Sequence, residues 1–182
     1  FEQPEEVNSS KSTKSPKRIA TAASSEKMFN EVEKLRQNDC RLLQSKNYEV
    51  FFAQANQIPE ILHEIGRLRE ITFRAIGEGT NESIDLDKFD QFYHHLFLWD
   101  TDKNVIAGAY RMGLGKDIFK KYGIEGFYLN DLFRFEPELY DMMSESIEMG
   151  RAFVTKEYQL KPMPLFLLWR GIVHVTLRYP EQ

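Results

Sequence analysis

The sequence predicts a mixed α/β (α+β) fold, in which helices cover a single sheet. Segments with strand and helix patterns follow one another in the order strand, helix, hairpin, small helices, strand, helix. This order gives packed layers but not the regular βαβ repeat of a dinucleotide-binding fold. Hydrophobic residues make up 42% of the 182 residues, which suffices for the core of one domain.

Three segments divide the chain. Residues 1–25 are rich in Ser, Lys, Thr, Pro and Glu, and we expect a disordered linker because they bury too little apolar surface to become ordered. Residues 26–46 have apolar side chains at near-helical spacing on a charged background, which predicts a short amphipathic helix. Residues 47–182 are expected to form the domain.

Within this domain, strands are expected over 48–53, 95–99, 105–112 and 149–155, and helices over 58–75, 117–122, 137–144 and 164–177. Pro59 suits a first helical position, because its missing N–H would be unpaired there. No strand follows the last helix, and the chain starts with Phe1 rather than Met. We therefore expect a piece of a longer polypeptide whose domain is incomplete at its C-terminal edge.

Composition narrows the classes of function. The formal net charge of −4 gives no global attraction to nucleic acid or to anionic lipid, although it leaves room for a local basic patch. Cys40 is the one cysteine, so no disulfide can form within the chain, and no zinc-type spacing is present. No apolar run approaches the roughly 18 residues of a membrane span. These features predict a cytoplasmic protein.

Arg69 is the first clue to a site. At about 100° per residue, it falls in the middle of the apolar stripe of its helix, where it must reach solvent or pair with carboxylates. An acidic triplet, Asp85, Asp87 and Asp90, follows. This run lacks the turn glycine and the final glutamate of a calcium loop, so no metal is expected. The pairing can be purely structural, or the arginine can face a site.

Two further clues lie on strands. Arg111 ends a strand on the same face as two alanines, which indicates a surface that a ligand approaches closely, although a solvent-facing arginine is the commoner case. Glu148 and Arg151 are three residues apart, and on a regular strand they would point to opposite faces. They can cooperate if residues 149–150 form a bulge, a feature often found beside active sites.

Together these residues resemble the signature of the acyl-homoserine lactone synthases: a helix arginine, an acidic triplet, a strand arginine and a Glu-x-x-Arg pair, in the same order. The first acid, usually Glu there, is Asp here, and the tryptophan common after the helix is replaced by Ile-Gly-Glu-Gly at 76–79. The matching positions are Arg69, Thr72, Phe73, Asp85, Asp87, Asp90, Arg111, Glu148 and Arg151.

The intervening residues are more similar to a sister group, the hemolysin-like N-acyltransferases that make lyso-ornithine or lyso-glycine lipids. The similar stretches are residues 64–69, 90–96 and 161–165. The resemblance covers about residues 48–180 and implies a GNAT-type fold with further strands after the last helix. Some members are fused behind a phospholipid-type acyltransferase domain, which implies such a domain N-terminal to this piece.

The resemblance implies direct transfer of a (3-hydroxy)fatty acyl group to the α-amine of a small amino acid, ornithine or glycine, without a covalent enzyme intermediate. By position, Glu148 is expected to orient or deprotonate the amine. Arg151 is expected to pair with Glu148 or with the acceptor carboxylate, for which Arg111 is a rival. Arg69 and the acidic triplet are expected to form the acceptor-side wall and to contact substrate.

The expected donor is the acyl-phosphopantetheine of acyl-carrier protein, with no bound cofactor. Acetyl-CoA enzymes of this fold cradle a pyrophosphate with a glycine-rich turn, and residues 156–162, at the corresponding place, contain no glycine. Because carrier proteins are acidic, we expect a basic docking patch, although scattered lysines can also be ordinary surface residues. The candidates are Lys116, Lys120, Lys121, Arg134, Lys156 and Lys161. Peripheral contact with the inner membrane surface is a further expectation.

Two other hypotheses stay open. A related enzyme would release a homoserine lactone from S-adenosylmethionine, or would use acetyl-CoA as donor. A non-catalytic, hemolysin-like lipid- or carrier-binding module would use Arg69, Arg111 and Arg151 only for stability. His94 and His95 help neither hypothesis, because alternation predicts one core-side and one solvent-side residue.

Overall fold

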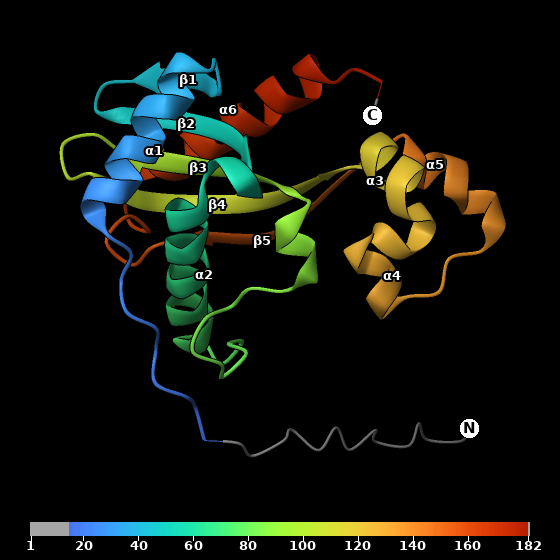
Figure 1. Cartoon of the computed structure of the whole chain (residues 1–182), viewed down its shortest axis with the longest axis horizontal. Coiled ribbons are helices and arrows are strands. Elements are labelled where there is room, and N and C mark those ends of the chain that lie inside the picture. Colours follow the sequence, from blue (N-terminus) through green and yellow to red (C-terminus); the bar gives the residue numbers. More distant parts are fainter. Residues whose placement is uncertain (1–14, 182) are drawn as a thin grey trace, which may run out of the picture.

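The computed structural model describes residues 15–181 as one antiparallel sheet flanked by helices (Figure 1). The five strands lie in the order β1-β2-β3-β4-β5, so each pairs with its neighbour in the chain. They are β1 (Arg41–Ser45), β2 (Tyr48–Gln54), β3 (His94–Asp100), β4 (Val105–Leu114) and β5 (Ile147–Val154). The α-helices are α1 (Ser25–Gln37), α2 (Pro59–Arg74), α3 (Gly115–Tyr122), α4 (Tyr128–Leu132), α5 (Tyr140–Ser144) and α6 (Pro162–Arg178).

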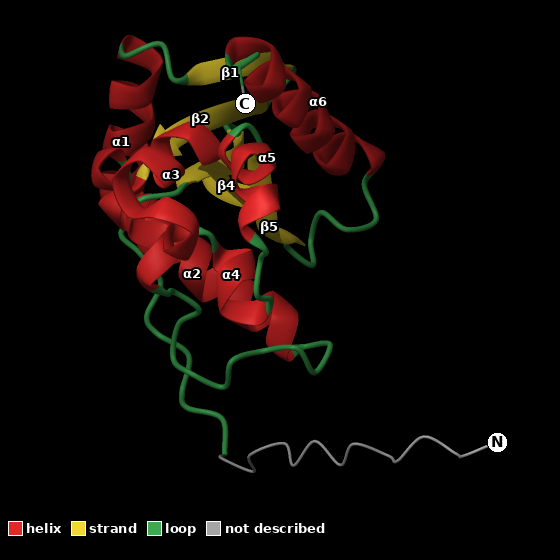
Figure 2. Cartoon of the chain, turned by 90° about the vertical axis from the view of Figure 1, so that its right-hand side faces the viewer, coloured by secondary structure: helices red, strands yellow, loops and turns green. Residues whose placement is uncertain are grey.

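Apolar layers form on both faces of the sheet, because successive strand residues point to opposite faces. Phe51 of β2 packs with side chains of α1 and α2, whereas Val50 and Phe52 pack with side chains of α6. Helices α1 and α2 therefore cover one face and α6 covers the other, as Figure 2 shows.

A third, smaller apolar cluster lies at the end of the sheet where α3, α4 and α5 gather (Figure 1). Its buried members are Phe89, Tyr93, Ile118, Phe127 and Met143. Tyr128, at the start of α4, packs against this cluster. The aromatic rings of the cluster form one wall of the candidate site described below.

The predicted mixed α/β fold is confirmed, and so are most of its elements. The expected strands match β2, β3, β4 and β5, and the two long expected helices match α2 and α6. Pro59 occupies the first position of α2, as expected. Helix α4 was not expected. No helix among residues 15–181 is both long enough and apolar enough to cross a bilayer.

The helix expected over residues 26–46 is wrong in its second half. Helix α1 ends at Gln37, Asp39 follows with a left-handed backbone (φ 54°), and residues 41–45 form β1. A turn at Lys46 (φ 53°) then reverses the chain, so that β1 pairs with β2. The apolar pair in β1 suits a helical stripe as well as a strand, and pairing with β2 decides between the two.

Part of the expected disordered linker is ordered by contacts with the loop that follows α2. The N–H of Lys17 donates to the carbonyl of Asn81 (2.9 Å), and the N–H of Ala20 donates to the carbonyl of Ser83 (2.8 Å). The expectation of disorder is therefore wrong for this stretch, while residues 1–14 lie outside the described residues.

Candidate active site

Arg69 lies at the centre of a buried ion network. Its side chain is 1% exposed, although it comes from the apolar face of α2. Nε lies 3.1 Å from Asp85 Oδ2, and Nη1 and Nη2 donate to the two carboxylate oxygens of Asp90 at 3.1 and 2.9 Å. The predicted pairing is thus confirmed for these two acids. Burial alone would raise the pKa of Asp90, but the hydrogen bonds and charge of Arg69 outweigh it and lower that pKa.

A tight turn directs the acidic triplet toward the arginines. Asp87 Oδ1 accepts two backbone N–H groups of a 3₁₀ helix (Lys88–Gln91) at 2.9 and 3.2 Å, and Asp90 Oδ2 accepts the N–H of Asp87 at 2.8 Å. This reciprocal cap fixes the two carboxylates relative to each other. The N–H of Asp85 donates to the carbonyl of Gly66 (3.1 Å), which ties the turn to α2.

Arg111 joins the same network from β4. Its Nη1 donates to Asp87 Oδ1 (2.6 Å) and lies 3.3 Å from Asp90 Oδ2. The guanidinium also lies 5.0–5.6 Å from the centroids of three aromatic rings, a cation–π environment. Burial lowers the pKa of Arg111, but the carboxylates outweigh it and raise that pKa, so the group stays charged. The three rings are Phe89, Tyr93 and Tyr128.

Arg151 reaches the network through a β-bulge. Between the register pairs Arg111–Gly150 and Ala109–Phe153, two residues of β5 oppose one residue of β4. Arg151 is the first of the two and has a left-handed backbone (φ 52°), which is uncommon outside glycine. The bulge therefore exists, but at residues 151–152, two positions later than expected.

Among the three arginines, Arg151 has the loosest contacts. Its Nη1 lies 3.5 Å from Asp85 Oδ2, and its Nη2 lies 3.5 Å from Asp87 Oδ2. Its Nε is buried without a hydrogen-bond partner. The side chains of Arg151 and Asp87 are 23% and 27% exposed, whereas those of Arg69 and Arg111 are 1% and 2% exposed. The network therefore meets solvent at the Arg151–Asp87 pair, where the contacts of the arginine are long enough for an anionic ligand to replace them.

Glu148 lies in β5 and is tied to the aromatic cluster. Its carboxylate accepts the N–H groups of Tyr128 (3.1 Å) and Leu129 (2.9 Å) and the hydroxyl of Tyr93. These bonds anchor the first turn of α4 to the sheet. Burial and the neighbouring carboxylate raise the pKa of Tyr93. The expected pairing of Glu148 with Arg151 is wrong, because Arg151 pairs with acids of the triplet; the expected catalytic role of Glu148 stays a prediction.

The two histidines differ in burial, as expected. His95 is fully buried, with Nε2 2.9 Å from the carbonyl oxygen of Asp90. Burial lowers the pKa of His95 to about 4, so the ring is neutral near pH 7. His94 is half-buried, and its ring stacks on Phe52 with 4.7 Å between centroids.

Tyr93 and Tyr128 are site residues that the sequence did not reveal. Tyr93 directly precedes the strand β3 and could have been noticed as an aromatic residue close to the acidic triplet. Nothing in the sequence distinguishes Tyr128, because its place depends on α4, which was itself not expected.

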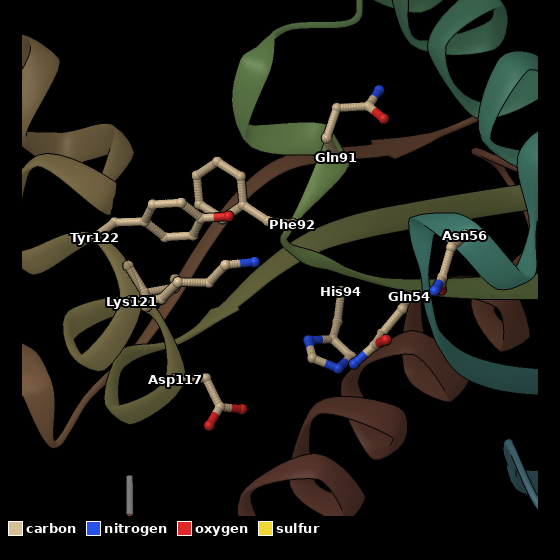
Figure 3. Close-up of a pocket in the computed structure, with 9 residues that line it drawn as sticks. Gln54, Asn56, Gln91, Phe92, His94, Asp117, Lys121 and Tyr122 are labelled. Carbon is tan, nitrogen blue, oxygen red and sulfur yellow. The ribbon is translucent and has the colours of Figure 1, made fainter.

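Two hollows are lined by residues outside the network. The first, of about 360 Å³, has a mixed polar and aromatic lining that includes the end of β2, the start of β3 and α3 (Figure 3). Phe92, in its wall, packs on Tyr93 with 5.4 Å between centroids. The second is a groove of about 850 Å³ between α2 and the segment that follows β5. Leu68 lines this groove, whereas Arg69 points from α2 into the buried network.

The groove has an apolar lining and a charged rim. Lys103 and Lys156 lie on the rim, together with Glu157, which pairs with Lys103 at 3.3 Å. The apolar side chains that line it are Met28, Leu68, Ile71, Ala75, Ile76, Val105 and Ile106. Such a groove suits a long, flexible apolar ligand better than a small polar one.

An antiparallel sheet flanked by helices, with a bulged strand next to clustered arginines and carboxylates, defines an acyltransferase fold of the GNAT class. Residues 68–169 match the model of the acetyltransferase (GNAT) domain family, and this range includes the seven site residues predicted from the sequence. Because the match spans more than half of the chain, the chain belongs to this family.

Two curated relatives have sequences similar to most of this chain. A glycine N(alpha)-acyltransferase of Bacteroides thetaiotaomicron is 34% identical over 152 residues, which cover 78% of this chain and 45% of that protein. A glycine N(alpha)-acyltransferase of Phocaeicola vulgatus is 36% identical over 152 residues, with coverages of 78% and 47%. The chain thus spans about half the length of these relatives. No solved structure matches it significantly.

Proposed function

We propose that this chain is the catalytic part of an N-acyltransferase that moves a fatty acyl group from acyl-carrier protein to the α-amine of glycine. The observation that supports this most is the Arg151–Asp87 pair, where the buried network meets solvent. One cation and one anion side by side complement the carboxylate and the ammonium of a free amino acid. The names of the two relatives favour glycine over ornithine as the acceptor.

In this proposal Arg151 binds the carboxylate of glycine. Its present contacts are long, at 3.5 Å, and its Nε has no partner, so a carboxylate can add strong hydrogen bonds. Arg111, the rival for this role, is 2% exposed and already engaged by Asp87 and Asp90. Asp87 Oδ2, which faces Arg151, binds the ammonium group before the reaction.

The reaction is aminolysis of a thioester. The amine nitrogen loses a proton and attacks the carbonyl carbon, so that a C–N bond forms, the C–S bond breaks and the thiolate takes a proton. Glu148 is the predicted base, although three donors already contact its two oxygens. Asp87 is the alternative base, acting directly or through a water. Backbone N–H groups along β5 are suitable donors for the oxyanion.

The donor is proposed to be a carrier-protein thioester, of the kind used by the hemolysin-like enzymes of aminolipid synthesis. The groove between α2 and the segment after β5 is large enough for an acyl-pantetheine arm, since ligand sites measure roughly 300–1,000 Å³. Lys103 and Lys156 on its rim can contact the phosphate of the arm or an acidic carrier protein. Long acyl chains are favoured because the lining of the groove is apolar.

Product analysis tests this function. The chain is incubated with 3-hydroxyacyl-carrier protein and glycine, ornithine or S-adenosylmethionine, and separately with acetyl-CoA and glycine, and the products are identified by mass spectrometry. N-acylglycine from the first mixture supports the proposal. A lactone or N-acetylglycine would support the competing enzymes instead, and a folded chain that binds carrier protein without turnover would support the binding module.

The acceptor site is tested by comparing glycine with glycinamide, which lacks the carboxylate. Arg151→Lys should raise KM for glycine roughly 10- to 100-fold, the equivalent of the about 1.5–3 kcal/mol of a hydrogen bond to a charged group. It should change KM for glycinamide little. Arg36→Lys is the matched control, because Arg36 of α1 pairs with Glu49 of β2, away from the network. Equal effects on both acceptors would refute the carboxylate contact.

A further inference from the structure

Gly150 of β5 is the one glycine whose place in the fold does not require a glycine. All ten glycines of the chain lie within residues 15–181. Gly77 and Gly123 have left-handed backbones (φ 80° and 63°), where a side chain would be strained. At seven others an added Cβ would lie 2.4–2.8 Å from a neighbouring atom, which is too close. Gly150 is not left-handed, and apart from its chain neighbours an added Cβ would have no atom within 4 Å.

The β-bulge does not require this glycine either. The bulge lies at residues 151–152, and its left-handed residue is Arg151. Gly150 precedes the bulge and forms a register pair with Arg111 of β4. A glycine inside a strand weakens the strand, because it loses much backbone freedom on folding and has no side chain to pack. Such a cost without a structural gain is typical of a position that a ligand approaches closely.

The open space over Gly150 lies among the charged side chains of the candidate site. Paired residues of neighbouring strands point to the same face, so Arg111 borders this space. Glu148, two residues before Gly150, points to that face as well. These two residues are only 2% and 8% exposed, so the space is not merely the solvent at the edge of the sheet. The ring of Tyr128 lies 5.0 and 5.3 Å from Cζ of Arg111 and Arg151 and borders the space from α4.

We infer that the space over Gly150 holds the α-carbon of the acceptor amino acid. This inference rests on the proposed function, in which Arg151 binds the acceptor carboxylate. The α-carbon is bonded to that carboxylate, so it must lie beside Arg151, and Gly150 is the neighbour of Arg151 in the chain. A side chain at position 150 would take the place of the acceptor. Gly150 is therefore a binding residue that acts by leaving room.

The charges around this space favour the acceptor over the acyl chain as its occupant. A zwitterionic amino acid can pair with the charged groups that border the space, whereas an acyl chain would cover them without replacing their contacts with water. The apolar groove proposed for the acyl chain reaches the end of β5 at Thr155, and Gly150 is not among its lining residues. Donor and acceptor would then meet between these two places, at the bulge.

Gly150→Ala tests the inference, because the added methyl group should block the acceptor without disturbing the fold. The Kd for glycine, measured by calorimetry without donor, should rise roughly 10- to 200-fold, the effect of one carbon in a packed ligand site. KM for glycine should rise with it, whereas KM for the acyl-carrier protein should change little. The midpoint of urea unfolding should not fall, because the methyl group contacts no neighbour beyond the adjacent residues and restricts the unfolded chain.

Ser45→Thr is the matched control, since it adds one carbon to β1, at the opposite edge of the sheet. It should change neither Kd nor KM. The inference is overturned if the native chain binds no glycine, if Gly150→Ala binds glycine as tightly as the native chain, or if its unfolding midpoint falls. A rise in KM for the carrier protein alone would assign the space to the donor and overturn it as well.

The inference and the proposed function can fail separately. A native chain that binds glycine, binds it more weakly after Gly150→Ala and makes no N-acylglycine would refute the acyl transfer but support the position of the acceptor. A native chain that makes N-acylglycine, with the same KM for glycine in Gly150→Ala, would support the acyl transfer and refute the role of Gly150.

Discussion

Replacing Arg69 with methionine tests whether this arginine stabilises the acidic turn. The side chains of Asp85 and Asp90 are 2% and 0% exposed, and the substitution removes their closest cation while keeping a side chain of similar length. Loss of one partner from a buried ion pair costs about 3–5 kcal/mol. Because Arg111 and Arg151 remain 3.3 and 3.5 Å from these acids, we expect a loss near the lower end, about 3 kcal/mol.

The loss of unfolding free energy caused by Arg69→Met should also depend on pH. In the native chain the pKa of Asp90 lies below its ordinary value, so this group adds stability above the unfolded pKa of about 3.9 and loses it only as pH falls through the lower folded pKa. Without Arg69, burial dominates and the folded pKa of Asp90 rises above the unfolded value. The variant then gains stability as pH falls through that raised pKa, by up to about 1.4 kcal/mol per pH unit. The difference in free energy of unfolding between the native chain and Arg69→Met should therefore become smaller as pH falls.

Urea unfolding at pH 7 and at pH 5 measures both quantities. Lys103→Met is the control, because Lys103 pairs with Glu157 on the surface, where a loss below about 1 kcal/mol with little pH dependence is expected. A loss of less than about 1 kcal/mol for Arg69→Met at pH 7, or a loss that stays the same at pH 5, would refute the proposed stabilisation.

Three further predictions concern single residues. Tyr93→Phe should lower the free energy of unfolding by about 1–3 kcal/mol, measured in urea, because the buried Glu148 carboxylate loses a donor. His95 has a folded pKa of about 4 against an ordinary 6.5, so its neutral form adds stability above pH 6.5 that is lost as pH falls. Between pH 6.5 and 5 the free energy of unfolding of the native chain should therefore fall by about 2 kcal/mol more than that of His95→Gln. Asp87→Asn should raise KM for glycine more than it lowers kcat, as steady-state kinetics will show.

The long, periodic elements of this fold were predictable because their patterns are local. The apolar stripe of α2 and the apolar and aromatic runs in β2, β3 and β4 are each visible in a few neighbouring residues. The strand β1 was mistaken for a helix because its five residues fit both patterns, and only pairing with β2 selects the extended form. Likewise α4 has one turn and no buried residue of its own, so it leaves no apolar signature in the sequence.

The seven site residues were identified by resemblance, but their contacts were only partly predictable. The pairing of Arg69 with nearby acids follows from the cost of an unpaired buried charge. Its choice of Asp85 and Asp90, with Asp87 left for Arg111, depends on the reciprocal cap in the acidic turn. The attachment of Glu148 to α4 could not be predicted, because the position of that helix is set by tertiary packing.

The three arginines differ in burial, and this difference, which composition does not show, separates their expected roles. Arg69 and Arg111 have close contacts with carboxylates and are closed to solvent, so their substitution should act mainly on stability. Arg151 has long contacts, an unused Nε and a left-handed backbone, which typically costs about 1–3 kcal/mol. A strained, undersatisfied cation persists only where its surroundings fix it, and the bulge and the buried acids provide such surroundings. The rigid part of the network thus holds Arg151 in place although the hydrogen bonds of this side chain are incomplete. In the function proposed above, the acceptor carboxylate completes them.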